Sequence, residues 1–299
     1  MEDHRIDTAL AILCILLAIA LPALIHGPSG TESDCVLNID LFMHESGETL
    51  TMSLEEYVAH ITAAITDADT PAEALSAVAT AMRTGALLKT EGACGNIYCD
   101  DPMHCFAYSP FFSDSCAEAV KATAGTVLIF NGSLLPAAVH KSSYLLTESA
   151  ADVTGTEISC LTSVITPESA EPLVIRYDLE KLKLILDVNF GIHLSFGDDI
   201  TMLSNAAGRV REVRIGDVSI PPSEFADALD LPSLCFTAER ADNIYTFTVF
   251  GDGSGLGLSI EGASVLAGNG AAYNDILSHY YRGCELKNIA DLPELFSSN

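Results

Sequence analysis

Tryptophan is absent from this sequence of 299 residues, and basic residues are scarce. Lys and Arg together number 14 against 41 Asp and Glu, so the formal net charge is −27 at pH 7 with histidine neutral. Because a polyphosphate backbone is bound by clustered Lys and Arg, this balance argues against a nucleic-acid partner. It also argues against docking on an anionic membrane surface. Aromatic residues make up only 7%, so a sugar-binding surface would have to use Tyr and Phe.

Charged residues are also few overall, at 18%, whereas hydrophobic residues reach 49%. A chain of this composition is not disordered, because it has enough apolar material to form a sizeable core. Its length fits one large domain or two average ones.

The N-terminal region contains a long apolar stretch. Residues 8–25 are eighteen consecutive residues without a charge, and a helix of that length rises roughly 27 Å, close to the thickness of a bilayer's hydrocarbon core. Arg5 precedes the stretch and no further Lys or Arg follows until Arg83, which favours an N-terminus inside the cell. The alternative is a signal peptide that is cleaved near residue 23. We expect a short cytoplasmic segment at residues 1–7, an uncleaved single-pass anchor in the cytoplasmic membrane at residues 8–26, a linker at residues 27–34, and the bulk of the chain outside the cytoplasm.

Residues 35–290 mix helical and strand patterns without a regular β–α–β alternation, which predicts an α+β domain with largely antiparallel strands. Thr70 begins the clearest helix, because Pro71 and Glu73 follow it as in a capping box. Asn131-Gly132 favours a type I′ hairpin turn. Residues 291–299 are expected to be a tail. The expected helices are residues 54–65, 71–88, 179–186, 259–267 and 272–281, with one more between a cap at Asp114 or Ser115 and Gly125; the expected strands are residues 36–42, 49–52, 126–130, 133–140, 209–215 and 244–250.

Three segments carry motifs that occur together elsewhere. Residues 54–65 read LEEYVAHITAAI, and PAEALSAVATAMRTGAL follows at residues 71–87. Residues 119–140 read AVKATAGTVLIFNGSLLPAAVH, and residues 253–283 read GSGLGLSIEGASVLAGNGAAYNDILSHYYRG. In this order and spacing they resemble the stage II sporulation protein D / amidase enhancer (SpoIID/LytB) family. The resemblance covers nearly the whole chain after the linker.

The resemblance implies an extracytoplasmic domain behind an N-terminal membrane anchor. Members of that family bind denuded glycan strands of peptidoglycan and cleave them as lytic transglycosylases, and they work with a sporulation amidase during engulfment. The partners implied for this chain are therefore glycan strands, a cell-wall amidase and, through the N-terminal helix, the membrane.

The residues that would carry the chemistry depart from the family pattern. Cleaving a glycosidic bond needs a carboxylic acid that protonates the leaving oxygen, and the family's acid falls on Ile65, whose alkyl side chain cannot donate a proton. Asp67 is a candidate replacement, although two residues along a continuing helix would turn its side chain away by roughly 200°. The simpler interpretation assigns Asp67 and Asp69 to a solvated turn. Glu56, kept from the family motif, is another candidate, but the helix dipole alone favours an acidic residue there.

Other family positions are also changed. The family's histidine is kept as His140, a further catalytic candidate, but the two glycines that follow it are Tyr144 and Leu145. In the closing segment the family's His and Gln become Ser254 and Ile260. The glycine-rich run in that segment lacks the Lys-Ser/Thr of a nucleotide-binding loop and indicates a tight turn. The candidate glycan contacts are Tyr57, Arg83, His140, Ser142 and Ser143.

These departures suggest a degenerate catalytic site in which cleavage is weak or absent. The favoured hypothesis is a membrane-anchored protein that binds peptidoglycan, or supports an amidase, during sporulation. The alternative is an active peptidoglycan lytic transglycosylase that uses a displaced carboxylate. A purely structural role in an envelope complex is the third hypothesis.

The cysteines form the last polar group of interest. Eight of the nine follow the anchor, an even number that permits four disulfides. Thiolates together with an imidazole suit tetrahedral Zn²⁺, and some family members are similar in holding zinc through a His and two Cys spaced as Cys99 and Cys105 are. Cys94 stands beside the position of the family's His, and His104 is a further candidate, although it and Cys105 are adjacent and cannot both ligate easily. We expect a structural zinc site among Cys94, Cys99, Cys105 and His104, with a disulfide or free thiols as the alternatives.

Overall fold

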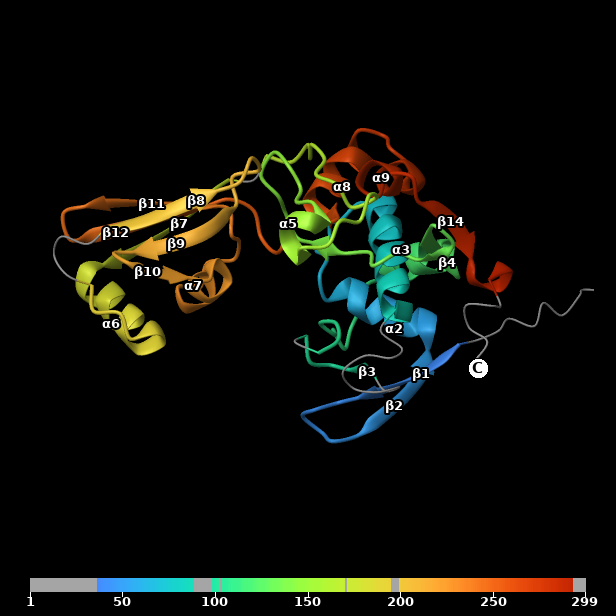
Figure 1. The fold of residues 1–299 in the computed structure, drawn as a ribbon. Helices are drawn as coiled ribbons and strands as arrows, with labels where there is room; N and C mark the ends of the chain where they lie inside the picture. Colours follow the sequence, from blue (N-terminus) through green and yellow to red (C-terminus); the bar gives the residue numbers. More distant parts are fainter. Residues whose placement is uncertain (1–36, 89–97, 103, 170, 195–198, 293–299) are drawn as a thin grey trace, which may run out of the picture. The chain divides into compact units, whose positions relative to one another are not determined.

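A computed structural model describes residues 37–88, 98–102, 104–169, 171–194 and 199–292 (Figure 1). The chain divides into residues 1–36 and a unit of residues 37–299. The expected anchor and linker lie outside the described residues, as do Cys35 and Cys94. Within the described ranges no helix is long and apolar enough to cross a membrane.

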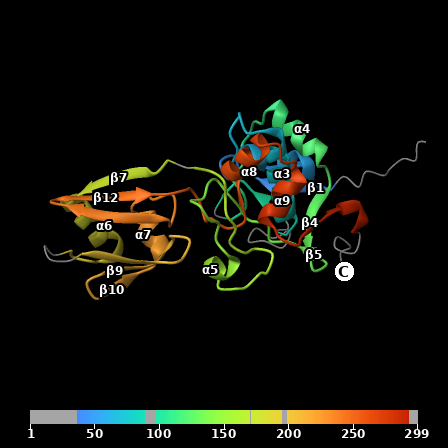
Figure 2. The same cartoon turned by 90° about the horizontal axis from the view of Figure 1, so that it is seen from above.

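The helix α3 (Ala72–Leu88) is buried along almost its whole length. Its sequence is rich in small apolar residues, and a helix that is apolar all round packs in the interior. Ala74, Ala77 and Ala81 have no exposed surface, so neighbouring elements approach the helix closely. Figures 1 and 2 show α3 among these neighbours, which are α2 (Leu54–Ala63), α4 (Asp114–Ala122), β4 (Thr126–Phe130), α8 (Ile260–Gly268) and α9 (Tyr273–Tyr280).

Short sheets flank these helices. β1 (Asn38–Phe42) pairs antiparallel with β2 (Thr49–Ser53) and parallel with β3 (Tyr98–Cys99). β4 pairs antiparallel with β5 (Ser133–Leu134) and with β14 (Glu285–Asn288), which the short 3₁₀ helix η2 (Ile289–Asp291) follows.

A two-stranded pairing links the middle of the chain to its C-terminal part. β6 (Val139–His140) runs parallel to β13 (Leu258–Ser259), and Ser259 is the N-cap of α8. His140 therefore lies beside the start of α8. The short helix α5 (Ala150–Thr154) follows β6 along the chain.

A second hydrophobic core lies within residues 173–249. Phe225, Phe236 and Phe247 pack at its centre, with ring centroids 6.0–6.3 Å apart. The helices α6 (Leu179–Phe190) and α7 (Pro222–Ala228) pack against the strands of this part (Figure 2). The strands form two antiparallel sheets in the orders β11 (Phe236–Ala241), β12 (Ile244–Val249), β7 (Leu173–Asp178) and β10 (Val218–Ile220), β9 (Val210–Ile215), β8 (Ile200–Ser204).

The structure confirms the α+β class with largely antiparallel strands. Several expectations were wrong in extent, among them the helix expected at residues 179–186, which continues to Phe190. The strand expected at residues 133–140 breaks after Leu134, because Pro136 has no N–H to donate, and residues 139–140 pair with β13 instead. The helix expected at residues 54–65 ends at Ala63. The turn at Asn131-Gly132 has positive φ at both residues, as a type I′ turn requires.

Candidate functional site

A pocket of about 340 Å³ opens between the end of α2 and the start of α8. The turn between α2 and α3 supplies Ile65 and Asp67 to it, and the first turn of α8 supplies Ile260 and Glu261. Ile65, on which the resemblance places the family's acid, therefore lies in a pocket although its side chain is aliphatic. The other lining residues are Asp69, Thr70, Pro71, Lys141, Glu168, Ser169, Ser264 and Val265.

Asp67 lies differently from the expectation. Because α2 ends at Ala63, the backbone leaves the helix before Asp67, and this exposed side chain lines the same pocket as Ile65. The condition of the argument against Asp67, a helix that continues to this residue, is therefore not met. The turn itself is as expected: Asp67 and Asp69 are exposed, and the Asp67 N–H donates to Thr70 Oγ1 at 3.2 Å.

A buried hydrogen-bond network lies behind the pocket and includes His140. His140 Nδ1 is 3.0 Å from the Leu256 carbonyl oxygen and Nε2 is 2.6 Å from Ser143 Oγ. A carbonyl only accepts, so Nδ1 carries the proton and Ser143 Oγ donates to Nε2. Burial lowers the pKa of His140 to about 4, and the positive charge of Arg209 acts in the same direction. His140 is therefore a neutral, fully partnered side chain of the interior.

Glu168 joins this network to the pocket. Its Oε1 accepts from the Ser143 backbone N–H at 2.9 Å and from Ser259 Oγ at 2.6 Å, and its Oε2 accepts from Thr166 Oγ1. Gly262 lies against the same group, and a Cβ there would clash with Glu168. The sequence reasoning missed Glu168, since it lies outside the recognised motifs.

A smaller pocket of about 220 Å³ shares Asp67 with the first one. Phe111 and Phe112 line it, and Phe111 is 81% exposed. Ser109 holds this turn, because its hydroxyl donates to the Phe111 carbonyl oxygen at 2.6 Å and accepts from the Phe111 N–H at 3.3 Å. Because the sequence has no Trp, an aromatic side chain that stacks on a sugar would have to be Phe or Tyr, and Phe111 is an exposed ring of this kind.

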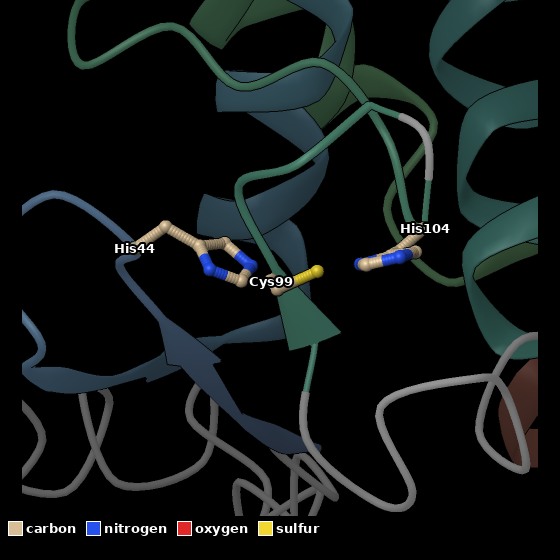
Figure 3. A group of neighbouring side chains, drawn as sticks. All are labelled: His44, Cys99 and His104. Atoms are coloured by element: carbon tan, nitrogen blue, oxygen red, sulfur yellow. The ribbon is translucent and has the colours of Figure 1, made fainter.

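A group of metal-ligand side chains lies between β1 and the loop after β3. Ligand atoms of His44, Cys99 and His104 all lie within 4.8 Å of one another, and Figure 3 shows the two imidazoles on either side of the Cys99 sulfur. The atoms around a tetrahedral Zn²⁺ are roughly 3.3–3.7 Å apart, so an ion would draw this group together by about 1 Å. Two imidazoles and one thiol are a suitable donor set.

Cys105 lies next to this group. Its Sγ is 3.5 Å from Cys99 Sγ, far longer than a disulfide bond of about 2.05 Å, and it accepts the Cys99 backbone N–H at 3.3 Å. A hydrogen bond to Cys99 raises the pKa of His44. The structure thus brings together three of the four expected ligands, adds His44, and leaves Cys94 outside the described residues. His44 was missed because it is 55 residues from Cys99 in a turn with no motif.

Comparisons with known proteins match the same regions. The family model described as stage II sporulation protein (SpoIID) matches residues 44–130. Stage II sporulation protein D of Bacillus amyloliquefaciens is 26% identical over 175 residues, which is 56% of this chain and 50% of that protein. The Bacillus subtilis (strain 168) protein of the same name is 25% identical over 177 residues, with the same coverage of both chains. The matched part thus spans about half the length of these relatives.

These matches support a distant relationship of this chain to the SpoIID family. An uncharacterized protein of Brachyspira hyodysenteriae is also similar, with 24% identity over 246 residues that cover 79% of this chain and 67% of that protein. The family match includes Ile65, Arg83 and the Cys99–Cys105 segment.

The five side chains expected to contact glycan lie in the interior of the structure. They are at most 5% exposed: Tyr57 0%, Arg83 0%, His140 5%, Ser142 4% and Ser143 0%. None of them lines either pocket. These side chains are therefore not exposed for direct contact in this structure, and Arg83, His140 and Ser143 make internal hydrogen bonds instead.

Arg83, in the segment that resembles the family motif, makes internal contacts and has no exposed surface. Its Nη2 is 2.6 Å from Glu55 Oε2 and its Nε is 2.9 Å from Glu55 Oε1. The guanidinium also donates to the carbonyl oxygens of Val120 and Thr126. A planar bidentate pair of this kind fixes α2 against α3 and the start of β4. Glu56, the neighbouring catalytic candidate, is exposed and does not line the pocket at Ile65.

Proposed function

We propose that this protein binds and acts on glycan strands of cell-wall peptidoglycan, in sporulating cells, through the pocket at Ile65. The observation that carries the proposal is the pocket itself, which is formed at the position of the family's acid although the acid is absent. Binding, with weak cleavage at most, is the function that this geometry supports best. The pocket would then hold a strand on which an amidase partner or the protein itself acts.

The lining suits a sugar chain. Ile65, Pro71 and Val265 offer apolar surface to the faces of sugar rings, while Thr70 and Ser264 offer hydroxyl groups. Small-molecule sites combine apolar walls with a few polar groups in this way. The exposed Phe111 beside the neighbouring pocket would extend the contact along the strand.

The proposal places the bulk of the chain outside the cytoplasm. The apolar residues 8–25 would anchor it in the cytoplasmic membrane as a single-pass protein. There the pocket would face peptidoglycan, and a cell-wall amidase that removes stem peptides would supply denuded strands.

Zinc is the proposed structural cofactor. His44, Cys99 and His104 would hold it, with Cys105 or Cys94 completing the set. Bound zinc would tie β1 to the loop after β3 and contribute folding energy there. A closed set of protein ligands would leave no open position for catalysis.

Co-sedimentation of the full chain, kept soluble in mild detergent, with denuded glycan strands tests the binding proposal. Ser264→Trp should fill the pocket and weaken binding at least tenfold, whereas Val188→Trp, on a side chain that is 73% exposed on α6, should not. The same co-sedimentation is carried out with peptidoglycan that still carries its stem peptides. The proposal is wrong if the unaltered chain does not sediment with denuded strands, or if Ser264→Trp binds as well as the unaltered chain.

A further inference from the structure

Four carboxylates line the pocket at Ile65, and they are not equivalent. They are Asp67, Asp69, Glu168 and Glu261. A group that protonates the oxygen of a glycosidic bond must meet three conditions. It must reach the pocket, keep its oxygens free of strong internal donors, and be partly buried, because burial favours the protonated form of a carboxyl group.

Glu168 fails the second condition. It is 7% exposed and accepts hydrogen bonds from Ser143, Ser259 and Thr166. Because both of its oxygens are occupied by these donors, Glu168 holds the loop after β6 against the start of α8.

Asp67 and Asp69 fail the third condition. Both are exposed on the turn between α2 and α3. Neither side chain has the partial burial that the third condition requires.

Glu261 meets all three conditions. It lies half-buried in the first turn of α8 and lines the pocket, and within the described residues its carboxylate makes no hydrogen bond. Burial raises its pKa, and the negative charges of Glu168, Asp252 and Asp67 act in the same direction, while Lys141 opposes them.

We infer that Glu261 takes the place of the lost acid opposite Ile65 and acts as the general acid and base for cleavage of the glycan backbone. The inference rests on the proposed function, because it needs a strand in this pocket. Glu261 follows Ile260, the position of the family's Gln, so the acid would approach the sugar from α8 instead of from α2.

The step balances without water or a cofactor. The Glu261 carboxyl proton passes to the bridging oxygen as the bond between that oxygen and C1 of the muramoyl sugar breaks. The C6 hydroxyl oxygen of the same sugar then bonds to C1, and its proton returns to the Glu261 carboxylate. The products are a strand with a new free hydroxyl and a strand that ends in a 1,6-anhydro sugar.

The test incubates the full chain with denuded glycan strands and measures anhydro-ended products by mass spectrometry, with co-sedimentation measured in parallel. Glu261→Gln should lower product release at least 100-fold while binding stays within a few-fold, since a missing general acid costs about 10²–10⁴ in rate. Glu180→Gln, on a side chain that is 82% exposed on α6, is the matched control and should leave the rate unchanged. The rate should also fall as the pH rises, as the Glu261 carboxyl loses its proton.

The outcomes separate the two proposals. If the unaltered chain binds strands but releases no anhydro-ended products, the role of Glu261 is wrong and the binding function stands. If products appear and Glu261→Gln leaves them unchanged, or if Asp67→Asn removes them instead, the assignment of the acid is also wrong. If the unaltered chain does not bind strands at all, the proposed function itself fails.

Discussion

Acidification should destabilise this protein through His140 in particular. The folded state holds this histidine neutral, with a pKa of about 4 against its ordinary value of 6.5. Between these two values the unfolded chain binds more protons than the folded chain does, so the free energy of unfolding rises with pH in this window and falls on acidification. The contribution is complete above about pH 6.5 and is lost progressively down to about pH 4.

The size of the effect follows from the shift. A difference of about 2.5 pH units corresponds to about 3 kcal/mol in full. About 2 kcal/mol of this is lost by pH 5, because the unfolded histidine is then almost fully protonated while the folded one is still neutral. The cause is burial, which disfavours the charged imidazolium, while the hydrogen bond to the Leu256 carbonyl group acts in the opposite direction.

Urea unfolding at pH values between 5 and 7.5 measures this contribution of His140 to the free energy of unfolding. His140→Asn keeps a donor for the Leu256 carbonyl oxygen but cannot take up a proton, so its stability should change with pH by about 2 kcal/mol less than that of the unaltered chain. His193→Asn removes a histidine whose side chain is 85% exposed and is the matched control. Equal pH dependence in the unaltered chain and in His140→Asn would refute the reasoning.

Three further predictions concern other parts of the molecule. Glu55→Gln leaves the buried Arg83 without its counter-charge, so urea unfolding should show a loss of about 3 kcal/mol; a change below about 0.5 kcal/mol would contradict the role of this pair. Protein purified under reducing conditions without chelators should carry zinc by metal analysis, and His44→Ala should lose most of it; retention of full zinc would exclude His44 as a ligand. Phe111→Trp introduces the only tryptophan, whose fluorescence should change when denuded glycan is added, whereas that of Leu184→Trp on the exposed face of α6 should not.

The sequence allowed the local elements of this fold to be predicted well. Capping and turn signals are local, so the helix beginning near Thr70 and the turn at Asn131-Gly132 lie where they were expected. The parallel pairing of β6 with β13 was not foreseen, because it joins residues more than a hundred positions apart. The second core within residues 173–249 was also missed, since alternating strand patterns do not reveal which strands share a core.

The candidate site could be predicted only in part. The motifs pointed to the region of Ile65, where the structure has a pocket, whereas Tyr57 and Arg83 are buried. A motif does not distinguish a residue that is kept for packing from one that is kept for contact. Glu261 lies within the recognised closing segment but was not singled out there, and His44 lies outside the three segments; only the three-dimensional structure places them in the pocket with Ile65 and beside Cys99.

The central claim is that the pocket at Ile65 holds a glycan strand. Hydrogen–deuterium exchange of the full chain, with and without denuded glycan strands, tests it most directly. The account predicts slower exchange in residues 65–71 and 260–265, which line the pocket, and no change in β9 of the second core. Slower exchange in β9 with none at the pocket, or no change anywhere at saturating glycan, would contradict the claim.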